Sequence, residues 1–223
     1  AGINLSYTDE KIFEGYAEDI NCGEKTGLSS ALFVNEDCKK IYGEIKDSEF
    51  IRGCVPMTKS EIRTLSISKL GLDNNSILYD VGAGTGSVSV AAALLCPDIR
   101  VYAIEKNMDA VELIKANKIK FCTDNIEIIE GEASAALDNI AENPTHVFIG
   151  GSGGRMTDIV GKIINKNETA RFVVNAVTPE TLSETLKVCE MYSRMPDIVQ
   201  IFAAKGEKIG NSTIMKALNP VYI

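Results

Sequence analysis

The sequence Asp80-Val81-Gly82-Ala83-Gly84-Thr85-Gly86 joins an apolar stretch that predicts a strand over residues 77–81 to an alanine-rich stretch that predicts a helix over residues 87–95. The glycines let the backbone turn sharply and keep side chains away from a ligand. In a parallel α/β sheet such a loop lies at the carboxyl edge, where these folds bind small molecules. The spacing is G-x-G-x-G rather than the G-x-G-x-x-G of dinucleotide-binding folds, which indicates a cofactor without a pyrophosphate.

Strands and helices alternate from residue 58 onward. We expect strands over residues 101–105, 126–129, 146–149 and 171–175, and helices over residues 58–70, 109–121, 133–140, 156–164 and 179–189. This alternation predicts a parallel sheet with helices on both faces. Residues 198–204 and 213–221 predict two more strands that form an antiparallel hairpin and close the sheet. The expected fold class is therefore α/β, a Rossmann-like, seven-stranded, mostly parallel sheet with a C-terminal antiparallel hairpin, as in class I S-adenosylmethionine-dependent methyltransferases.

Acidic residues follow the next two strands at positions where a nucleoside is held. Glu105 ends a predicted strand about 20 residues past the loop, where a ribose-binding acid belongs in this topology. Glu132 and Ala133 follow the third strand, where contact with adenine is expected. Together with the loop, these positions favour S-adenosyl-L-methionine as the cofactor. A nicotinamide cofactor and a purely structural turn remain alternatives.

The composition of the 223 residues limits the function classes. A net charge of -8 without a run of Lys and Arg argues against a nucleic-acid partner. The 6 cysteines are scattered and His146 is the single histidine, so no metal site is expected. We find neither a signal peptide nor an 18-residue apolar run, and so expect a soluble, cytoplasmic protein without a membrane partner.

Four segments resemble the precorrin C15-methyltransferase/decarboxylase family of cobalamin biosynthesis: residues 55–63, 79–89, 148–154 and 217–221. The resemblance covers about residues 45–223. It implies methylation of carbon 15 of a precorrin-6B-type tetrapyrrole, with or without cobalt, coupled to decarboxylation of the ring-C acetate. It also implies a homotetramer. Carried over by position, the residues that hold the cofactor are Thr58, Gly82, Ala83, Gly84, Thr85, Gly86, Glu105 and Ala133.

The N-terminal residues differ from a stand-alone enzyme of this kind. We expect residues 1–45 to be an N-terminal extension and residues 46–223 to be the methyltransferase domain. Residues 4–12 resemble the tail of the partner C5-methyltransferase, which some organisms fuse ahead of this domain. Since the sequence also begins at Ala1 rather than Met, we expect it to be the C-terminal part of such a bifunctional protein.

The loop after the strand at residues 146–149 faces the substrate side of this fold, and its candidates are Gly151, Ser152, Gly153, Gly154 and Arg155. A glycine loop that opens a helix suits anions, and precorrins carry many carboxylates; a tight structural turn is the alternative. Further carboxylate contacts could come from Lys59, Asn175, Arg52, Arg63 and Lys205, for each of which a surface or capping role is as plausible. His146 is expected to be structural, and no catalytic side chain is identified.

Two rival functions stay open. An RNA adenine or protein isoaspartate methyltransferase would share the fold, but it should carry a polar or aromatic nucleophile-holding motif after the fourth strand, and an RNA enzyme should be more basic. A non-enzymatic nucleotide-binding module would also keep the loop, although the intact Glu105 argues against decay of the site.

Overall fold

The structure is a computed structural model that describes residues 2–3, 8, 11–12, 15, 29–30 and 43–223. The chain divides into two units, Ala1–Lys39 and Lys40–Ile223, and each is described by itself. In the first unit, β1 (Gly2–Ile3) pairs antiparallel with β2 (Lys11–Ile12) and with β3 (Ser29–Ser30). Most of the segment that resembles the partner enzyme's tail lies outside the described residues.

The second unit is built on a five-stranded sheet in the order β6-β5-β4-β7-β8, in which every neighbouring pair is parallel. The strands are β4 (Ile77–Val81), β5 (Arg100–Glu105), β6 (Ile126–Glu130), β7 (His146–Ile149) and β8 (Arg171–Val174). β4 lies in the middle, so the loop that follows it lies at the point where the strand order reverses. That point is where open α/β sheets bind ligands.

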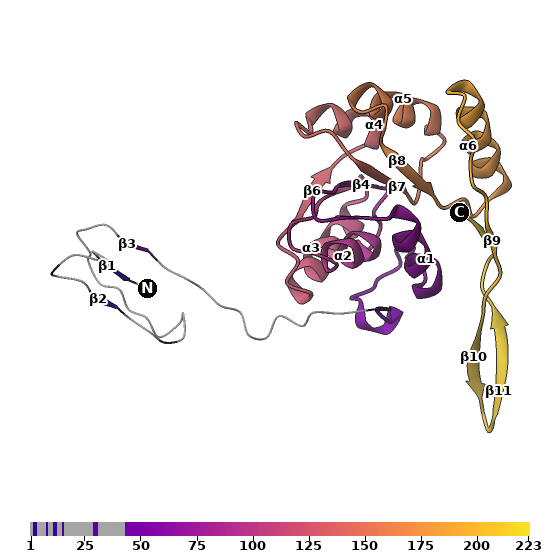
Figure 1. The fold of residues 1–223 in the computed structure, drawn as a ribbon. Helices are drawn as coiled ribbons and strands as arrows, with labels where there is room; N and C mark the ends of the chain where they lie inside the picture. The colour runs from indigo at the N-terminus through magenta and orange to yellow at the C-terminus, as the bar shows by residue number, and fades with distance from the viewer. Residues whose placement is uncertain (1, 4–7, 9–10, 13–14, 16–28, 31–42) are drawn as a thin grey trace. The chain divides into compact units, whose positions relative to one another are not determined.

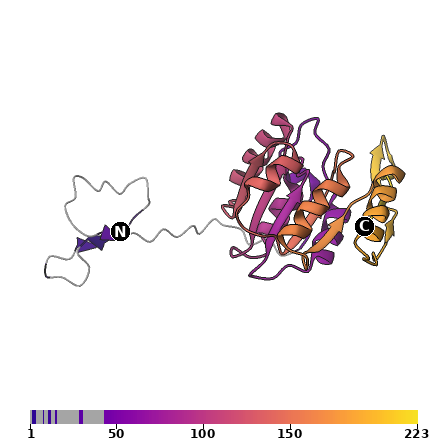
Figure 2. The ribbon, with the colours of Figure 1, turned by 90° about the horizontal axis from the view of Figure 1, so that it is seen from above.

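Helices cover both faces of this sheet (Figures 1 and 2). One buried cluster joins one face to α1 (Ser60–Leu70), α2 (Ser87–Ala93) and α3 (Met108–Lys120), and a second joins the other face to α4 (Ala133–Ala136), α5 (Met156–Lys166) and α6 (Pro179–Met191). Successive strand residues enter opposite clusters, as Leu78 and Tyr79 do, because side chains alternate along a strand. The predicted parallel sheet between two helical layers is confirmed.

Local signals set several helix ends. Gly71 ends α1 in the left-handed conformation (φ +65°), and the Asn107 side chain accepts hydrogen bonds from the first-turn amides of α3. The helix expected over residues 133–140 is instead α4 followed by the 3₁₀ helix η2 (Leu137–Asn139). Within the described part of the chain, no helix is both long and apolar enough to cross a membrane.

The C-terminal strands close the sheet, although not as the sequence predicted. β9 (Gln200–Ile201) pairs antiparallel with β12 (Val221–Tyr222), and an antiparallel bridge between Ala176 and Tyr222 joins this pair to the end of β8. A separate hairpin of β10 (Ala204–Ile209) and β11 (Ser212–Ala217) projects from the body (Figure 1). Residues 205–211, which the two expected strands left as the connection between them, are therefore mostly strand, because β10 takes up all but residues 210–211.

Candidate functional site

A cleft of about 730 Å³ opens at the carboxyl edge of the parallel sheet, within the size range of small-molecule sites. The ends of β4, β5, β7 and β8 form its floor, and residues 55–59 and the base of the hairpin at residues 217–219 form part of its walls. Most of the predicted site residues meet in it: Thr58, Lys59, Gly82, Ala83, Gly84, Glu105, Glu132, Ala133, Gly151, Ser152, Gly153 and Asn175. Thr85, Gly86, Gly154 and Arg155 do not line it.

The loop after β4 needs its glycines for close packing as well as for its conformation. Gly82 and Gly84 have φ angles of +71° and +58°. A Cβ on Gly82 would lie 2.7 Å from the Gly151 carbonyl oxygen, and one on Gly84 would lie 2.9 Å from the Pro56 carbonyl oxygen. The main chain of this loop is therefore clamped between two other segments, and it presents bare backbone to the cleft.

Thr85 and Gly86 complete the same loop from inside the protein. Thr85 is fully buried, and its carbonyl oxygen accepts a hydrogen bond from the Asn117 amide at 2.9 Å. Gly86 caps α2 with φ +74°, and a Cβ there would lie 3.1 Å from the Ile114 side chain. Both residues set the course of the backbone, while their direct contact with a cofactor stays a prediction.

Glu105, at the end of β5, holds the glycine loop through its carboxylate. One oxygen accepts from the Gly84 backbone amide at 2.8 Å, and the other accepts from the amides of Lys106 and Asn107 at 2.9 Å each. A carboxylate has about four lone-pair positions, so the oxygen bonded to Gly84 keeps room for one more donor. Because Glu105 lines the cleft, a ligand hydroxyl can supply that donor.

Glu132 stands next to this position, just after β6. Its carboxylate accepts from Lys106 Nζ at 3.1 Å and lies 3.8 Å from the Arg155 guanidinium. Arg155, predicted as a substrate-loop residue, thus turns toward the predicted adenine end and away from the cleft lining. Ala133, the first residue of α4, lines the cleft beside Gly131, whose φ is +140°.

The loop after β7 forms the opposite half of the cleft. A Cβ on Gly151 would meet nothing within 4 Å, so this residue borders open space. Ser152 is buried, and its carbonyl oxygen accepts from the Arg155 amide as the chain turns into α5. Asn175, directly after β8, is buried at the same edge, and its side-chain amide lies 3.1 Å from Ser66 Oγ, whose hydroxyl donates to the Ile62 carbonyl oxygen at 2.8 Å.

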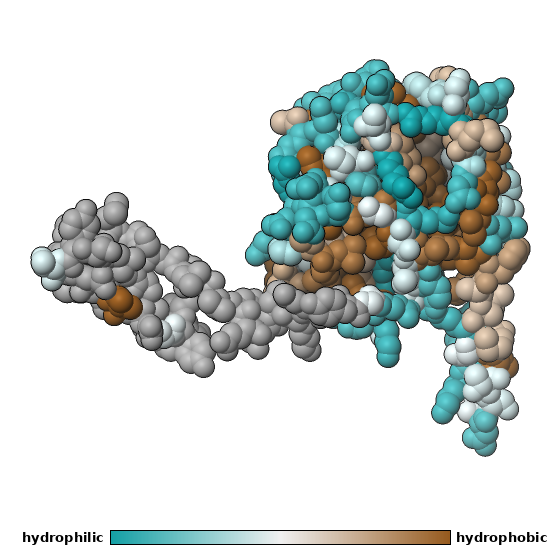
Figure 3. All heavy atoms as spheres, viewed as in Figure 1, coloured by the Kyte–Doolittle hydropathy of each residue, from teal (hydrophilic) through white to brown (hydrophobic). Residues whose placement is uncertain are grey.

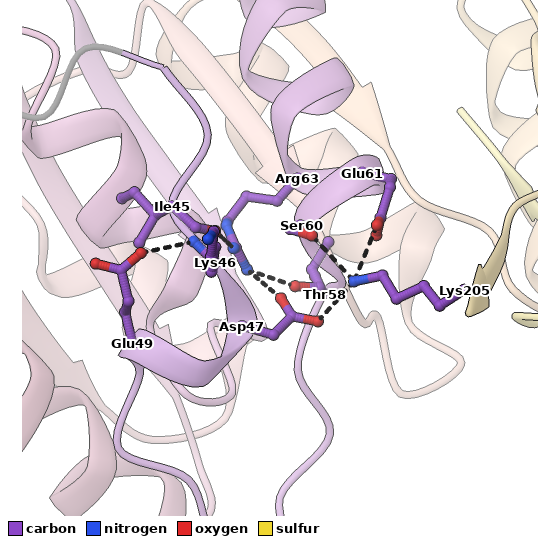
Figure 4. A network of polar contacts seen from close by, with 9 residues as sticks. All are labelled: Ile45, Lys46, Asp47, Glu49, Thr58, Ser60, Glu61, Arg63 and Lys205. Atoms are coloured by element: carbon purple, nitrogen blue, oxygen red, sulfur yellow. Dashed lines mark hydrogen bonds and ion pairs between the residues drawn. The ribbon is translucent and has the colours of Figure 1, made fainter. Parts of the chain in front are cut away.

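Thr58 is held by Arg63, which the sequence suggested as a substrate contact. The Arg63 side chain is 2% exposed and donates to the carbonyl oxygens of Thr58 (2.7 Å) and Ile45, beside Asp47 at 3.3 Å (Figure 4). Burial lowers the pKa of Arg63, and the charge of Asp47 counteracts this effect. The substrate role suggested for Arg63 is therefore wrong, because its donors fix the backbone that carries Thr58.

Lys205 is also occupied elsewhere. From β10 it bonds to Glu61 at 2.9 Å and to Ser60 Oγ at 3.2 Å, with Asp47 at 3.6 Å (Figure 4). It ties the base of the hairpin to the start of α1 and does not line the cleft. The sequence pattern around Lys205 could not predict these contacts, because its partners lie far away in the sequence.

Two further candidates lie outside the cleft. His146 starts β7 at the opposite edge of the sheet, and its Nδ1 lies 2.9 Å from Thr145 Oγ1. Burial lowers the pKa of His146, and its place at the edge away from the cleft agrees with the structural role predicted for it. Arg52 is exposed and does not line the cleft.

Asp80 supports the site from beneath. It is fully buried in β4 and accepts a hydrogen bond from Ser89 Oγ on α2. Burial raises its pKa to about 7, which the bond from Ser89 partly opposes. The sequence places Asp80 directly before the loop, and the structure shows that it links the strand before the glycine loop to the helix after it.

Comparisons with known proteins agree with this geometry. The family model described as a precorrin methyltransferase domain matches residues 51–223. A probable cobalt-precorrin-6B C(15)-methyltransferase (decarboxylating) of Sulfurisphaera tokodaii is 40% identical over 182 residues, 80% of this chain and 94% of that protein. A protein of Salmonella typhimurium named cobalt-precorrin-6B C(15)-methyltransferase (decarboxylating) is 38% identical, over 80% of this chain and 93% of its own.

Solved structures extend the likeness to three dimensions. The crystal structure of a precorrin-6y C5,15-methyltransferase from Geobacter metallireducens superposes with a TM-score of 0.75 at 34% identity, covering 81% of this chain and 93% of that one. Two of the segments that carried the resemblance, residues 55–63 and 217–221, contribute residues 55–59 and 217–219 to the walls of the cleft. The chain belongs to the precorrin methyltransferase family.

Proposed function

We propose that this protein is an S-adenosylmethionine-dependent C-methyltransferase that methylates carbon 15 of a precorrin-6B-type tetrapyrrole and decarboxylates its ring-C acetate in cobalamin biosynthesis. The observation that carries the proposal is the joint cleft, in which a clamped glycine loop and Glu105 form one half and a second glycine loop with Asn175 forms the other. The named relatives support the same reaction. Neither an RNA or protein substrate nor a purely nucleotide-binding role has a comparable observation behind it.

The cofactor half fits S-adenosylmethionine. The backbone of residues 82–84 leaves no side chain in the way, and Glu105 has an acceptor position left for a ribose hydroxyl. Ala133 and Glu132 would border the adenine, and Thr58 would close the site from the wall at residues 55–59. When bound, the cofactor supplies a methyl group on a sulfonium centre. The chain's own contribution is to fix the position and direction of that group.

The substrate half suits a large, partly apolar acceptor. Its lining includes Val177, Leu218 and Val221, with the neutral polar groups of Ser152 and Asn175 among them. The backbone at residues 150–153, which leads into α5, is the proposed anion-binding segment for a macrocycle carboxylate. Methyl transfer from sulfur to carbon needs an aligned pair of reactants rather than a protein nucleophile, so we assign these residues to binding and orientation.

We propose in addition that the protein is a homotetramer, and the observation that supports this is the exposed hairpin of β10 and β11. It projects from the body with exposed apolar side chains at Ile209, Ile214 and Met215, and Figure 3 shows apolar residues along it and polar ones at its tip. A two-stranded hairpin is marginally stable alone, so a partner surface would stabilise it. Light scattering should give the mass of four chains, and Met215→Glu should lower it; a monomeric wild type would contradict the tetramer.

The proposal also places the protein in the cytoplasm and residues 1–45 at the tail of a preceding C5-methyltransferase. The cytoplasmic assignment is supported by the cysteines within the described residues, Cys54, Cys96, Cys122 and Cys189, which are free and so suit a reducing compartment. The fusion is supported by the resemblance of residues 4–12. No membrane partner and no nucleic acid is proposed, the latter because of the net charge of -8.

Turnover of a precorrin-6B-type substrate with methyl-labelled S-adenosylmethionine tests the function directly. We expect the label in the macrocycle and one carbon dioxide released per methyl group, with cobalt-loaded and cobalt-free substrate run in parallel to decide which is preferred. Label transfer to RNA or protein instead, or no transfer to either tetrapyrrole, would overturn the proposal.

A further inference from the structure

The hairpin of β10 and β11 contacts the body of the second unit through one charged side chain. Every residue of the two strands is exposed except Lys205, which is partly buried. Among the described residues, Lys205 also makes the hairpin's only side-chain hydrogen bond and ion pairs to the body, with Ser60, Glu61 and Asp47. The remaining ion pair of the hairpin joins its own two strands. Lys205 is therefore the side chain that restrains the hairpin relative to α1.

The base of the same hairpin forms a wall of the cleft. Ala217 ends β11 one position past the residue that faces Lys205 in the register. Next to it, the Leu218 amide donates to the Ala203 carbonyl oxygen at 2.8 Å, which joins the two chains beyond the hairpin. The cleft-lining residues of this wall are Ala217, Leu218 and Asn219. A shift of the hairpin at its base would therefore shift the wall as well.

Two partners of Lys205 begin α1, directly after the other wall of the cleft at residues 55–59. Lys205 Nζ donates to Ser60 Oγ at 3.2 Å and lies 2.9 Å from the Glu61 carboxylate (Figure 4). The bond with Glu61 raises the pKa of Lys205, so the ammonium group stays charged. A partly exposed ion pair adds little to the stability of a whole domain. Its effect is expected instead on the position of the two segments that it joins.

Asp47 lies between Lys205 and Arg63 and contacts each of them with a different oxygen. Its Oδ2 lies 3.6 Å from Lys205 Nζ, and its Oδ1 lies 3.3 Å from the Arg63 guanidinium (Figure 4). Arg63 keeps its own bond to the Thr58 carbonyl oxygen at 2.7 Å and stacks 4.7 Å from the centre of the Phe50 ring. Loss of Lys205 would therefore release the hairpin base but leave Thr58 in place, so the two walls can be disturbed separately.

We infer that Lys205 is a positioning residue of the reaction, which holds Leu218 and Asn219 against the bound tetrapyrrole. This inference rests on the proposed function and adds to it a residue outside the cleft that sets the shape of the substrate half. The lining there includes the apolar side chains of Leu218 and Val221. Apolar contacts weaken steeply when a gap opens between the surfaces, so binding of a large macrocycle depends on how closely this wall approaches it.

Two substitutions at Lys205 test the assignment. Lys205→Met removes the charge and keeps most of the length of the side chain. We expect the substrate KM to rise by about tenfold while kcat stays within about twofold, because the wall contacts the substrate alike before and during the reaction. The affinity for S-adenosylhomocysteine should also stay within about twofold, which shows that the cofactor half is intact. Lys205→Arg keeps the charge and the reach, and should return the KM to within about threefold of the wild type.

Lys208→Met is the matched control. Lys208 lies on the same strand and is exposed, and its side chain points to the other face of the hairpin, because side chains alternate along a strand. This variant should keep the KM, the kcat and the cofactor affinity of the wild type. Light scattering is measured on every variant. A KM rise in Lys205→Met that comes with a lower mass would assign Lys205 to assembly and would overturn the positioning role.

The kinetic outcomes separate the inference from the proposed function. A wild type that yields neither labelled macrocycle nor carbon dioxide overturns the proposed function. With a normal wild type, three results overturn the assignment of Lys205 alone. These are an unchanged KM in Lys205→Met, a KM in Lys205→Arg that is no better than in Lys205→Met, and a cofactor affinity that falls in step with the rise in KM.

Discussion

The two glycine loops at the carboxyl edge of the sheet look alike in sequence but differ in how they use their glycines. In the loop after β4, Gly82, Gly84 and Gly86 each combine a positive φ with an atom 3.1 Å or closer to where a Cβ would lie. In the loop after β7, Gly150 is also packed closely, 3.1 Å from the Phe148 side chain, but Gly153 has a positive φ and no neighbour closer than 3.6 Å, and Gly151 borders open space. Packing therefore restrains all three glycines of the first loop, whereas the second loop keeps room beside Gly151 and Gly153.

This difference matches the two ligands. A cofactor that is common to many methyltransferases needs one fixed binding site. A closely packed backbone loses little conformational freedom when the cofactor binds to it. The acceptor substrate is larger, and it needs volume more than a fixed contact at every point. The substitutions that follow should therefore have large effects in the first loop and its supports, and small effects on cofactor binding in the second.

Gly84→Ala should have the largest effect. The new Cβ would lie 2.9 Å from the Pro56 carbonyl oxygen, at a φ of +58° that alanine rarely adopts. Relief of this clash would displace either the loop or the wall that carries Thr58. We expect the dissociation constant for S-adenosylhomocysteine, measured by calorimetry, to rise by about 100-fold or more. Wild-type affinity in this variant would remove the loop from the cofactor site.

Glu105→Gln should have the next largest effect. The carboxylate accepts from three backbone amides, and a glutamine would turn an NH₂ group toward one or more of these donors. We expect the dissociation constant for S-adenosylhomocysteine to rise by about 10- to 100-fold, in line with the loss of charge-assisted bonds. Glu130→Gln, an exposed acid at the end of β6 paired with Lys115, is the matched control and should bind as wild type does.

Asp80→Asn should alter the pH dependence of stability. Burial raises the pKa of Asp80 to about 7 from its ordinary value of 3.8, so the folded state holds this proton more tightly than the unfolded state. The resulting stabilisation is complete at low pH and is lost as the pH rises through 7. Between pH 6 and pH 7.5, the wild type should lose about 1 kcal/mol more of its unfolding free energy than Asp80→Asn in denaturant titrations. Parallel pH profiles of the two proteins would contradict this account.

Gly151→Ala should have the smallest effect on the cofactor half. A Cβ at this position meets no atom within 4 Å, and the residue does not require a positive φ. We expect the affinity for S-adenosylhomocysteine to change by less than about twofold and the melting temperature to stay close to that of the wild type. The substrate KM should rise, because the added methyl group occupies the cleft. A loss of cofactor affinity like that of Gly84→Ala would erase the distinction between the loops.

Much of this architecture could be predicted from the sequence, because the strands and helices around the glycine loop have clear apolar patterns and end signals. The exposed hairpin could not. The residues of β10, such as Lys205, Gly206 and Glu207, are polar on both faces, so they read as a turn although their backbone pairs with β11. Alternation marks a strand only where one face is buried.

The positions of site residues could be predicted where the order of the strands determines them. They could not be predicted where side chains distant in the sequence determine them. Gly82, Gly84 and Glu105 lie in one cleft because the topology of a parallel sheet brings them there. The burial of Arg63 against Thr58, by contrast, depends on residues 45–47, which approach it only in the folded chain. The same holds for the bond between Asn175 and Ser66, which are 109 positions apart.

A crystal structure of the protein with S-adenosylhomocysteine tests the central claim most directly. The account predicts ribose hydroxyls on the free acceptor side of Glu105, the amino-acid portion against the main chain of residues 82–84, and an open space beside Gly151 for the acceptor. A cleft that stays empty at saturating product, or a ligand seated away from both Glu105 and the loop after β4, would contradict it.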